Sequence, residues 1–361
     1  MKRTLIALGV AAAVVAPIAN AAPTVYGRLN VTVQSADNDI NSDEVVTVRS
    51  NASRIGVKGD EKLTDSLSAV YLIEWELAAD SASGANDLTA RNRFLGLQHK
   101  DLGTIKAGTI DTLVKQAEGK IDQFGDLQYA DIEGILGAQG GPARASNVIE
   151  YNSPKIADLL NFNVQLIQGE ETTAPGTTKA KNNGLADAYG FSVVAATGPL
   201  WATIAYEKDV ATRTAGWDNG SNAAAVPPLP SLGYRQTGVS DGTLRVGASY
   251  ELKDLGLTVG GLYQQTDLVN AAGADLAEEN GFIVSAALKL GKSVVAKAQY
   301  GQATFEPVAG ADVDLTQITL GADYNFTKTT KAFAFYSAYN AERGSDERDA
   351  NVFGIGLQTN F

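Results

Sequence analysis

The chain ends in NVFGIGLQTNF (residues 351–361), and this stretch decides the fold. Every second residue is apolar, from Phe353 through Ile355 and Leu357 to Phe361, with only Thr359 departing from the pattern. The residues between them are glycines or carry an amide group. Strict alternation predicts a β-strand with one apolar face. Chain ends usually fray into water, so a strand that finishes on phenylalanine is expected to be held by a neighbouring strand.

The N-terminal segment predicts export from the cytoplasm. Two basic residues precede an apolar run, and Ala19-Asn20-Ala21 fits the small-residue pattern of a signal-peptide cleavage site. We therefore expect residues 1–21 to be a cleaved secretory signal peptide and residues 22–361 to form the mature domain. An uncleaved membrane anchor is the alternative, but the apolar run is short for a membrane span of about 20 residues.

The composition excludes several classes of protein. Removal of Lys2 and Arg3 lowers the basic count from 29 to 27 against 41 acidic residues, a net charge of −14 that argues against a nucleic-acid partner. The lack of cysteine excludes disulfides and thiolate metal sites. Past the signal segment no apolar run approaches the length of a membrane helix. The 37 glycines and 10 prolines, with 13 tyrosines and 11 phenylalanines, favour strands and turns.

The alternating pattern recurs along the whole chain. Sixteen runs of about ten residues begin near residues 24, 53, 66, 91, 103, 147, 160, 186, 200, 243, 256, 280, 293, 315, 330 and 350. Each is long enough for a tilted membrane strand. Seven short turns alternate with eight long loops at residues 37–48, 78–90, 112–145, 169–185, 211–242, 267–279, 306–314 and 341–349.

This sorting of short and long connections is typical of an outer-membrane barrel, and a soluble β-sandwich gives no reason for it. We expect an all-β fold, a closed 16-stranded antiparallel transmembrane β-barrel. Closure against the first strand would leave no unpaired sheet edge in lipid. It would place Phe361 in an aromatic girdle, with the apolar faces toward lipid and the polar faces toward a water-filled pore.

Four motifs carry a family resemblance that covers essentially the whole mature chain. They are VYGRLNV (25–31), SRIGVKGDEKL (53–63), RNRFLGLQHKDLGTIKAG (91–108) and GIGLQTNF (354–361). They resemble the general diffusion porins of Gram-negative bacteria. The resemblance implies a homotrimer in the cell outer membrane, surrounded by lipid and lipopolysaccharide, that passes small hydrophilic solutes and ions. It also implies a third long loop folded inward as a constriction.

The third loop, residues 112–145, is the longest connection and is rich in glycine, which permits tight reversals. We expect it to fold inward and to supply the acidic side of the constriction. The family's Pro-Glu-Phe-Gly-Gly motif is absent, and IDQFGDLQ (121–128) is the nearest stretch. The expected acidic residues are Asp122 and Asp126, with Asp131 and Glu133 behind them.

Basic residues on the barrel wall are expected to face this loop. The resemblance matches Arg28, Arg54 and Arg91 to the basic side of the family's constriction. Alternation agrees, because an arginine on the lipid face near the midplane costs about 2–4 kcal/mol. A lipid-facing Phe94 would place Arg91 and Arg93 inside together. The same pattern turns Arg28, Arg54 and Lys58 inward.

The balance of charge predicts a mild cation preference. The loop holds five acidic residues against three basic ones, and VIEYNSP (148–154) has Glu150 and Asn152 where many relatives carry another base. In an alternative interpretation, the arginines only pair with loop carboxylates and hold the loop in place. Eleven acidic residues in the loops at 37–48, 267–279 and 306–314 serve either solubility or divalent-ion bridging to anionic lipid.

Other functions have weaker support. The one histidine, His99, follows a strand beside a short turn, so a serine hydrolase site or a multi-histidine zinc centre is not expected. We expect no enzyme activity, cofactor or metal. A channel specific for sugars or anions is the first alternative, but the third loop has only two aromatic residues, Phe124 and Tyr129. A surface receptor or adhesin that binds through loop 211–242 is the second.

Overall fold

The computed structural model describes residues 22–38, 41–80, 88–127, 130–136, 144–169, 184–211, 239–270 and 273–361. Strands dominate these residues, and helices are limited to single turns. No helix in the described ranges is both long enough and apolar enough to cross a membrane.

The first half of the barrel consists of β1 (Thr24–Asn38), β2 (Asn41–Ser50), β3 (Arg54–Lys62), β4 (Leu67–Leu77), β5 (Leu88–His99), β6 (Gly103–Asp111), β7 (Arg144–Asn152), β8 (Leu160–Ile167) and β9 (Ala188–Thr197). The second half consists of β10 (Leu200–Lys208), β11 (Val210–Ala211), β12 (Val239–Leu252), β13 (Leu257–Val269), β14 (Asp275–Leu290), β15 (Val294–Pro307), β16 (Val313–Asn325), β17 (Thr330–Arg343) and β18 (Asp346–Asn360). The short helices are α1 (Leu113–Gln116), α2 (Glu133–Leu136) and the 3₁₀ turn η1 (Lys253–Leu255).

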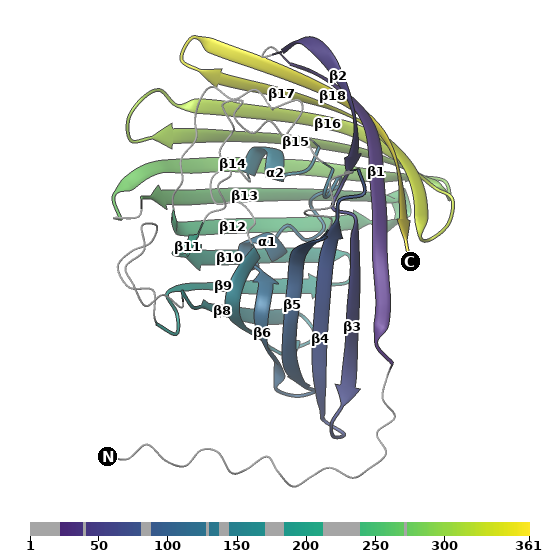
Figure 1. The fold of residues 1–361 in the computed structure, drawn as a ribbon, viewed down its shortest axis with the longest axis vertical. Helices are drawn as coiled ribbons and strands as arrows, with labels where there is room; N and C mark the ends of the chain where they lie inside the picture. Colours follow the sequence, from purple (N-terminus) through teal and green to yellow (C-terminus); the bar gives the residue numbers. More distant parts are fainter. Residues whose placement is uncertain are drawn as a thin grey trace.

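These segments form one closed antiparallel ring (Figure 1). β2 and β3 both pair with β1 and are two halves of one strand, which is interrupted where Ala52 has a φ of 46°. β10 and β11 likewise both pair with β12, with Asp209 between them at a φ of 58°. Over the described residues the segments therefore make 16 strands, and this confirms the predicted fold class.

The chain end is held as the sequence predicted. β18 pairs with β1 along its length, and Gly27 and Phe361 exchange backbone hydrogen bonds of 2.8 and 3.0 Å. A Cβ atom on Gly27 would lie 2.3 Å from the Phe361 ring, so only glycine leaves room for that ring. Closure satisfies backbone groups that a membrane would leave without partners.

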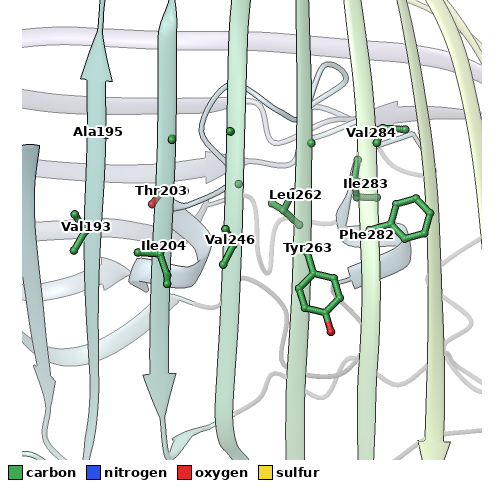
Figure 2. Close-up of a pocket in the computed structure, with 14 residues that line it drawn as sticks. Val193, Ala195, Thr203, Ile204, Val246, Leu262, Tyr263, Phe282, Ile283 and Val284 are labelled. Carbon is green, nitrogen blue, oxygen red and sulfur yellow. The ribbon is translucent and has the colours of Figure 1, made fainter. Parts of the chain in front are cut away.

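The outer face is apolar across many strands. Leu357, Ile355 and Phe353 are all more than half exposed, as expected for side chains that meet lipid. Figure 2 shows Val193, Ile204, Val246, Tyr263 and Phe282 in a row across β9, β10, β12, β13 and β14. They border a shallow apolar groove of about 610 Å³, which belongs to this lipid-facing surface.

Several predicted loops are in fact strand extensions. β2 occupies most of the expected loop 37–48, and β13 and β14 leave only residues 270–274 of the expected loop 267–279. The loops at 306–314 and 341–349 shorten in the same way. Acidic residues obscured these extensions in the sequence, because strands that continue beyond the bilayer can carry charge on both faces.

The third loop connects β6 to β7, and its described residues, 112–127 and 130–136, lie inside the ring. Figure 1 shows α1 and α2 enclosed by the strands. α1 contacts β8, β9, β10 and β12, whereas α2 contacts β14, β15 and β16. Thr112 caps the first of these turns by accepting a 3.3 Å hydrogen bond from the N–H of Lys115. The described part of the loop therefore runs along one side of the interior.

Candidate functional site

The inner face of β12–β17, which we call the covered wall, packs against the third loop. Ile121, Phe124 and Leu136 of the loop are at most 4% exposed and join one apolar cluster with wall residues such as Ile283 and Phe335. The expectation of a uniformly polar interior is therefore wrong on this side. Period-two alternation predicts two faces, but it cannot tell whether water or protein meets the inner one.

Glycines on consecutive strands make this close approach possible. At each of them a Cβ atom would lie within 3.3 Å of a loop atom, too close for a normal side chain. These glycines are Gly247 on β12, Gly260 on β13, Gly281 on β14, Gly301 on β15 and Gly321 on β16. The loop therefore packs into a shallow groove in which these wall positions have no side chains.

Polar side chains of the covered wall hold the loop by its backbone. Ser285 donates a hydrogen bond to the carbonyl of Ile121, and the Nζ of Lys297 donates to that of Gln123 at 2.8 Å. The Lys297 Nζ also lies 4.7 Å from the centre of the Phe124 ring. Gln299 and Gln317 donate to two further loop carbonyls. Every residue has a backbone carbonyl, so these hydrogen bonds fix the path of the loop backbone whatever side chains the loop carries.

Arg245 anchors the start of the loop. Its guanidinium is fully buried and donates to the Val114 carbonyl at 2.9 Å, to Glu118 at 3.3 Å and to the amide oxygen of Gln264 at 2.9 Å. A buried guanidinium is tolerated only when its donors are satisfied. Its place between Leu244 and Val246 in an alternating strand is consistent with an inward side chain, but nothing in the sequence indicated that it contacts the loop.

The tip of the loop reaches β1 and β3. One oxygen of Asp126 accepts from Arg28 and, at 2.7 Å, from the Nη2 of Arg54. Asp126 has a φ of 54°, and it follows Gly125 in a tight reversal. The structure therefore brings together three of the predicted residues in direct contact, instead of holding the charges apart across an opening.

Asp122 shapes the same reversal. Its carboxylate accepts 2.9 Å hydrogen bonds from the N–H groups of Phe124 and Gly125. Burial raises the pKa of the Asp122 carboxyl above its usual range, the nearby Asp126 adds to the rise, and the N–H donors oppose it. Asp122 thus supports the turn that presents Asp126.

Asp131 and Glu133 lie farther along the loop. The carboxylate of Asp131 accepts from the N–H of Gly134 at 3.3 Å, and its carbonyl accepts from Gln317. Both contacts face the covered wall and α2. Glu133 begins α2, and its side chain lies outside the described part of the structure.

The inner face of β3–β8, which we call the open wall, is charged. Arg91 donates to Glu74 and Glu76 at 2.7 Å each, and Arg54 lies 3.9 Å from Glu74. Tyr26 donates to the other oxygen of Glu74 at 2.8 Å. The two glutamates were missed in the sequence, although their alternation within LSAVYLIEWEL (67–77) marks both as inward-facing charges.

The prediction that Arg93 faces inward together with Arg91 is wrong. The pairing of β4 with β5 shifts between Ile73 and Trp75, so that Arg91 and Asn92 together oppose Glu74. This β-bulge turns both residues inward and reverses the alternation that follows. Arg93 is therefore exposed on the outer face with Leu95, and Phe94 faces inward beneath Lys106.

A second ion pair lies farther around the open wall. Lys106 is 2.9 Å from an oxygen of Glu150, whose side chain is fully buried. Glu150 also accepts from Gln116 of α1, Asn152 and Gln165. This network connects the open wall to the first turn of the third loop.

The remaining candidates contribute little to a site. The Nδ1 of His99 accepts from the N–H of Asp101 in a turn, and no group of three metal-ligating side chains occurs within the described ranges. Most of the expected binding loop 211–242 lies outside the described residues.

Comparison with known proteins agrees with this geometry. The family model described as Gram-negative porin matches residues 7–344. The chain is 24% identical to the major outer membrane protein P.IB of Neisseria gonorrhoeae over the full length of both. Its fold resembles an anion-selective porin from Comamonas acidovorans, with a TM-score of 0.72 and 21% identity over 94% of this chain and 99% of that one.

A further solved structure is the trimer form of OmpT from Vibrio cholerae, with a TM-score of 0.64 and 19% identity over 94% of this chain and 99% of that one. The family match spans most of the sequence, and the relatives are channel proteins rather than enzymes. The chain therefore belongs to the Gram-negative porin family and is an outer-membrane channel for passive diffusion.

Proposed function

We propose that the water passage runs between the third loop and the open wall, and that Arg28, Arg54, Asp122 and Asp126 form its narrowest part. The observation that carries this proposal is the apolar packing of the loop on the covered wall. That packing fills one side of the interior, so water has room only beside the charged side. Asp131 and Glu133 are proposed to support the loop behind the tip, and Arg91 to order Glu74 and Glu76.

The passage is proposed to admit small hydrophilic solutes and ions with a mild preference for cations. Two of its carboxylates are more accessible than its guanidiniums: Glu76 and Asp126 are 37% and 31% exposed, against 21% for Arg28, 18% for Arg54 and 10% for Arg91, although Glu74 is buried. Exposed charge lining a pore decides which ions enter. The anion selectivity of the Comamonas porin belongs to that protein, and the proposed preference of this chain has the opposite sign.

The test is a single-channel recording in a planar bilayer that separates two KCl concentrations. We expect stepwise, ohmic conductance with a small reversal potential of the sign for cations. Asp126→Asn removes the acceptor of two guanidiniums and should shift the reversal potential toward anions. A matched control is Asp65→Asn, because Asp65 lies in a turn and is 99% exposed.

An unchanged reversal potential in Asp126→Asn would show that Asp126 only holds the loop. A control that shifts as much as Asp126→Asn would mean that the effect reflects total charge rather than the constriction. A complete absence of conductance steps would contradict the channel itself.

The proposal extends to processing and assembly. Residues 1–21 are proposed to be a cleaved signal peptide, and the mature barrel to form a homotrimer among outer-membrane lipid and lipopolysaccharide. The trimer form of OmpT supports the oligomeric part by similarity. N-terminal sequencing of the mature protein should begin at Ala22, and conductance should rise in groups of three steps. A start at Met1 or steps that occur only singly would contradict these points.

Phe361 is proposed to guide barrel closure. Its backbone forms two hydrogen bonds with Gly27, and such bonds contribute about 1 kcal/mol each. Deletion of Phe361 should lower the yield of folded protein in the outer membrane. Phe326→Ala is the control, because both rings are 60% exposed. Equal yields for the deletion and for wild type would contradict this role.

A further inference from the structure

The open wall carries an apolar strip where a water-filled passage favours polar side chains. Glu74 faces inward, since it lies beside Arg54, which contacts Asp126 of the third loop, and Tyr26 shares that face because it donates to Glu74. Leu72 lies two residues before Glu74 in an unbroken register, so it shares that face. Phe94 lies beneath Lys106, whose ion pair with Glu150 marks it as inward too. All three apolar side chains are partly exposed.

Two ammonium groups accompany this strip. The Nζ of Lys58 lies 5.0 Å from the centre of the Tyr26 ring, and that of Lys106 lies 4.8 Å from the centre of the Phe94 ring. Lys106 is neutralised by Glu150. Lys58 is exposed, and no carboxylate in the described part of the chain forms an ion pair with it. The strip therefore combines apolar surface with one uncompensated positive charge.

The spacing suits a planar anion. Lys58 on β3 is paired directly with Leu72 on β4, which is paired directly with Phe94 on β5. Two interstrand steps span about 10 Å. The three residues therefore form one row across the wall, with the Lys58 ammonium over Tyr26 at one end, so that an aromatic acid held by Lys58 has Leu72 and Phe94 as its apolar neighbours.

We propose that Lys58, Leu72 and Phe94, flanked by Tyr26 and Lys106, form a binding subsite for aromatic monocarboxylates. The proposal rests on the passage along the open wall. Inorganic anions have no apolar body to use Leu72 and Phe94, sugars have no charge for Lys58, and organic cations are repelled by the uncompensated Lys58 ammonium. A mild cation preference among small ions is compatible with it, because that preference follows net exposed charge, whereas the subsite also requires apolar contact.

The test is the effect of benzoate, with acetate for comparison, on KCl current through wild-type channels in a planar bilayer. Benzoate should reduce the current in a saturable manner, and acetate at the same concentration should not. Lys58→Gln should raise the half-blocking concentration of benzoate by about tenfold, which is a tenfold loss of affinity. Leu72→Asn should also raise the half-blocking concentration of benzoate, and Lys58→Arg should retain the block.

Lys62→Gln is the matched control, because it removes the same charge four residues along the same face, where Lys62 pairs with Asp65 in a turn. Equal weakening in Lys62→Gln and Lys58→Gln would overturn the subsite, as would block by acetate equal to that by benzoate. Normal KCl conductance without preferential block contradicts the subsite alone. Loss of conductance in wild type contradicts the proposed passage. If Lys58→Gln fails to assemble, Leu72→Asn and Lys58→Arg decide.

Discussion

The covered wall and the open wall belong to one antiparallel sheet, yet their inner faces meet different neighbours. The covered wall meets the third loop with glycines and apolar residues, such as Gly260 and Ile283, and with polar side chains that bond to the loop backbone, such as Ser285. The open wall carries ion pairs, as between Arg54 and Glu74 and between Lys106 and Glu150, beside the partly exposed Leu72 and Phe94. The difference teaches that strand periodicity fixes which residues face inward, and the neighbour of each face fixes what those residues are.

The interactions that the loop makes with the two walls also differ in their contribution to stability. Six large apolar residues of the loop are buried against the covered wall: Ile121, Phe124, Leu127, Ile132, Ile135 and Leu136. Full burial of such a side chain contributes about 1.5–3 kcal/mol, whereas a solvent-exposed ion pair contributes about 0–1 kcal/mol. The partly exposed ion pairs at the loop tip therefore adjust its position, and apolar packing holds the loop in place.

The largest expected effect comes from placing a side chain at one of the covered-wall glycines that contact the loop. Gly260→Leu places a side chain where a Cβ atom would already lie 3.3 Å from the Cα of Ile121. Overpacking of this kind costs about 1–3 kcal/mol, and backbone cannot rotate away as a side chain can. The third loop should be displaced, which should raise single-channel conductance and current noise.

Gly261→Leu is the adjacent control. Gly261 faces outward, and its nearest neighbour would be 3.8 Å from a Cβ atom. Conductance should match wild type in this variant. If the two variants behave alike, the covered wall is not the seat of the loop, and the comparison between the walls fails.

A smaller effect is expected from acidification. Because burial raises the pKa of Asp122, its charge is present above that raised pKa and is lost, as pH falls, before an ordinary aspartate protonates. Protonation also removes the penalty of burying a charge, so docking of the loop should become more favourable as pH falls. Cation preference should therefore weaken on mild acidification while the loop stays in place.

Asp122→Asn separates this effect from the titration of other groups. The variant should lack the early step in reversal potential as the pH is lowered, because the group with the raised pKa is gone. An early step that persists in Asp122→Asn would assign the titration elsewhere. An early step accompanied by a rise in conductance would contradict the expected stability of the docked loop.

Much of the fold was predictable from period-two alternation and the sorting of loop lengths. These patterns gave the number of strands, the closure at Phe361 and the inward directions of Arg28 and Arg54. The strand extensions were missed because acidic residues such as Asp43 and Glu278 resemble loop composition. Outside the bilayer, neither face of a strand must be apolar, so the alternation loses its contrast there.

The candidate site was predictable only in part. The bulge at Arg91 and Asn92 adds one residue to β5 without any glycine or proline to mark it, and it reverses the direction of Arg93. The contact of Asp126 with two arginines depends on how far the loop reaches across the interior, which residue spacing does not determine. The glycines of the covered wall were visible in the sequence, but nothing there distinguished them from other strand glycines. Their role depends on their contact with the loop, which only the structure shows.

The central claim is that water passes along the open wall and is excluded from the covered wall. The chain has no cysteine, so single cysteines can be tested with a water-soluble charged thiol reagent while current is recorded. Asn152→Cys lies on the open wall and is partly exposed, whereas Thr319→Cys lies on the covered wall and is fully buried. We expect the reagent to change the current through Asn152→Cys and to leave Thr319→Cys unchanged. Rapid modification of Thr319→Cys with no effect on Asn152→Cys would contradict the account.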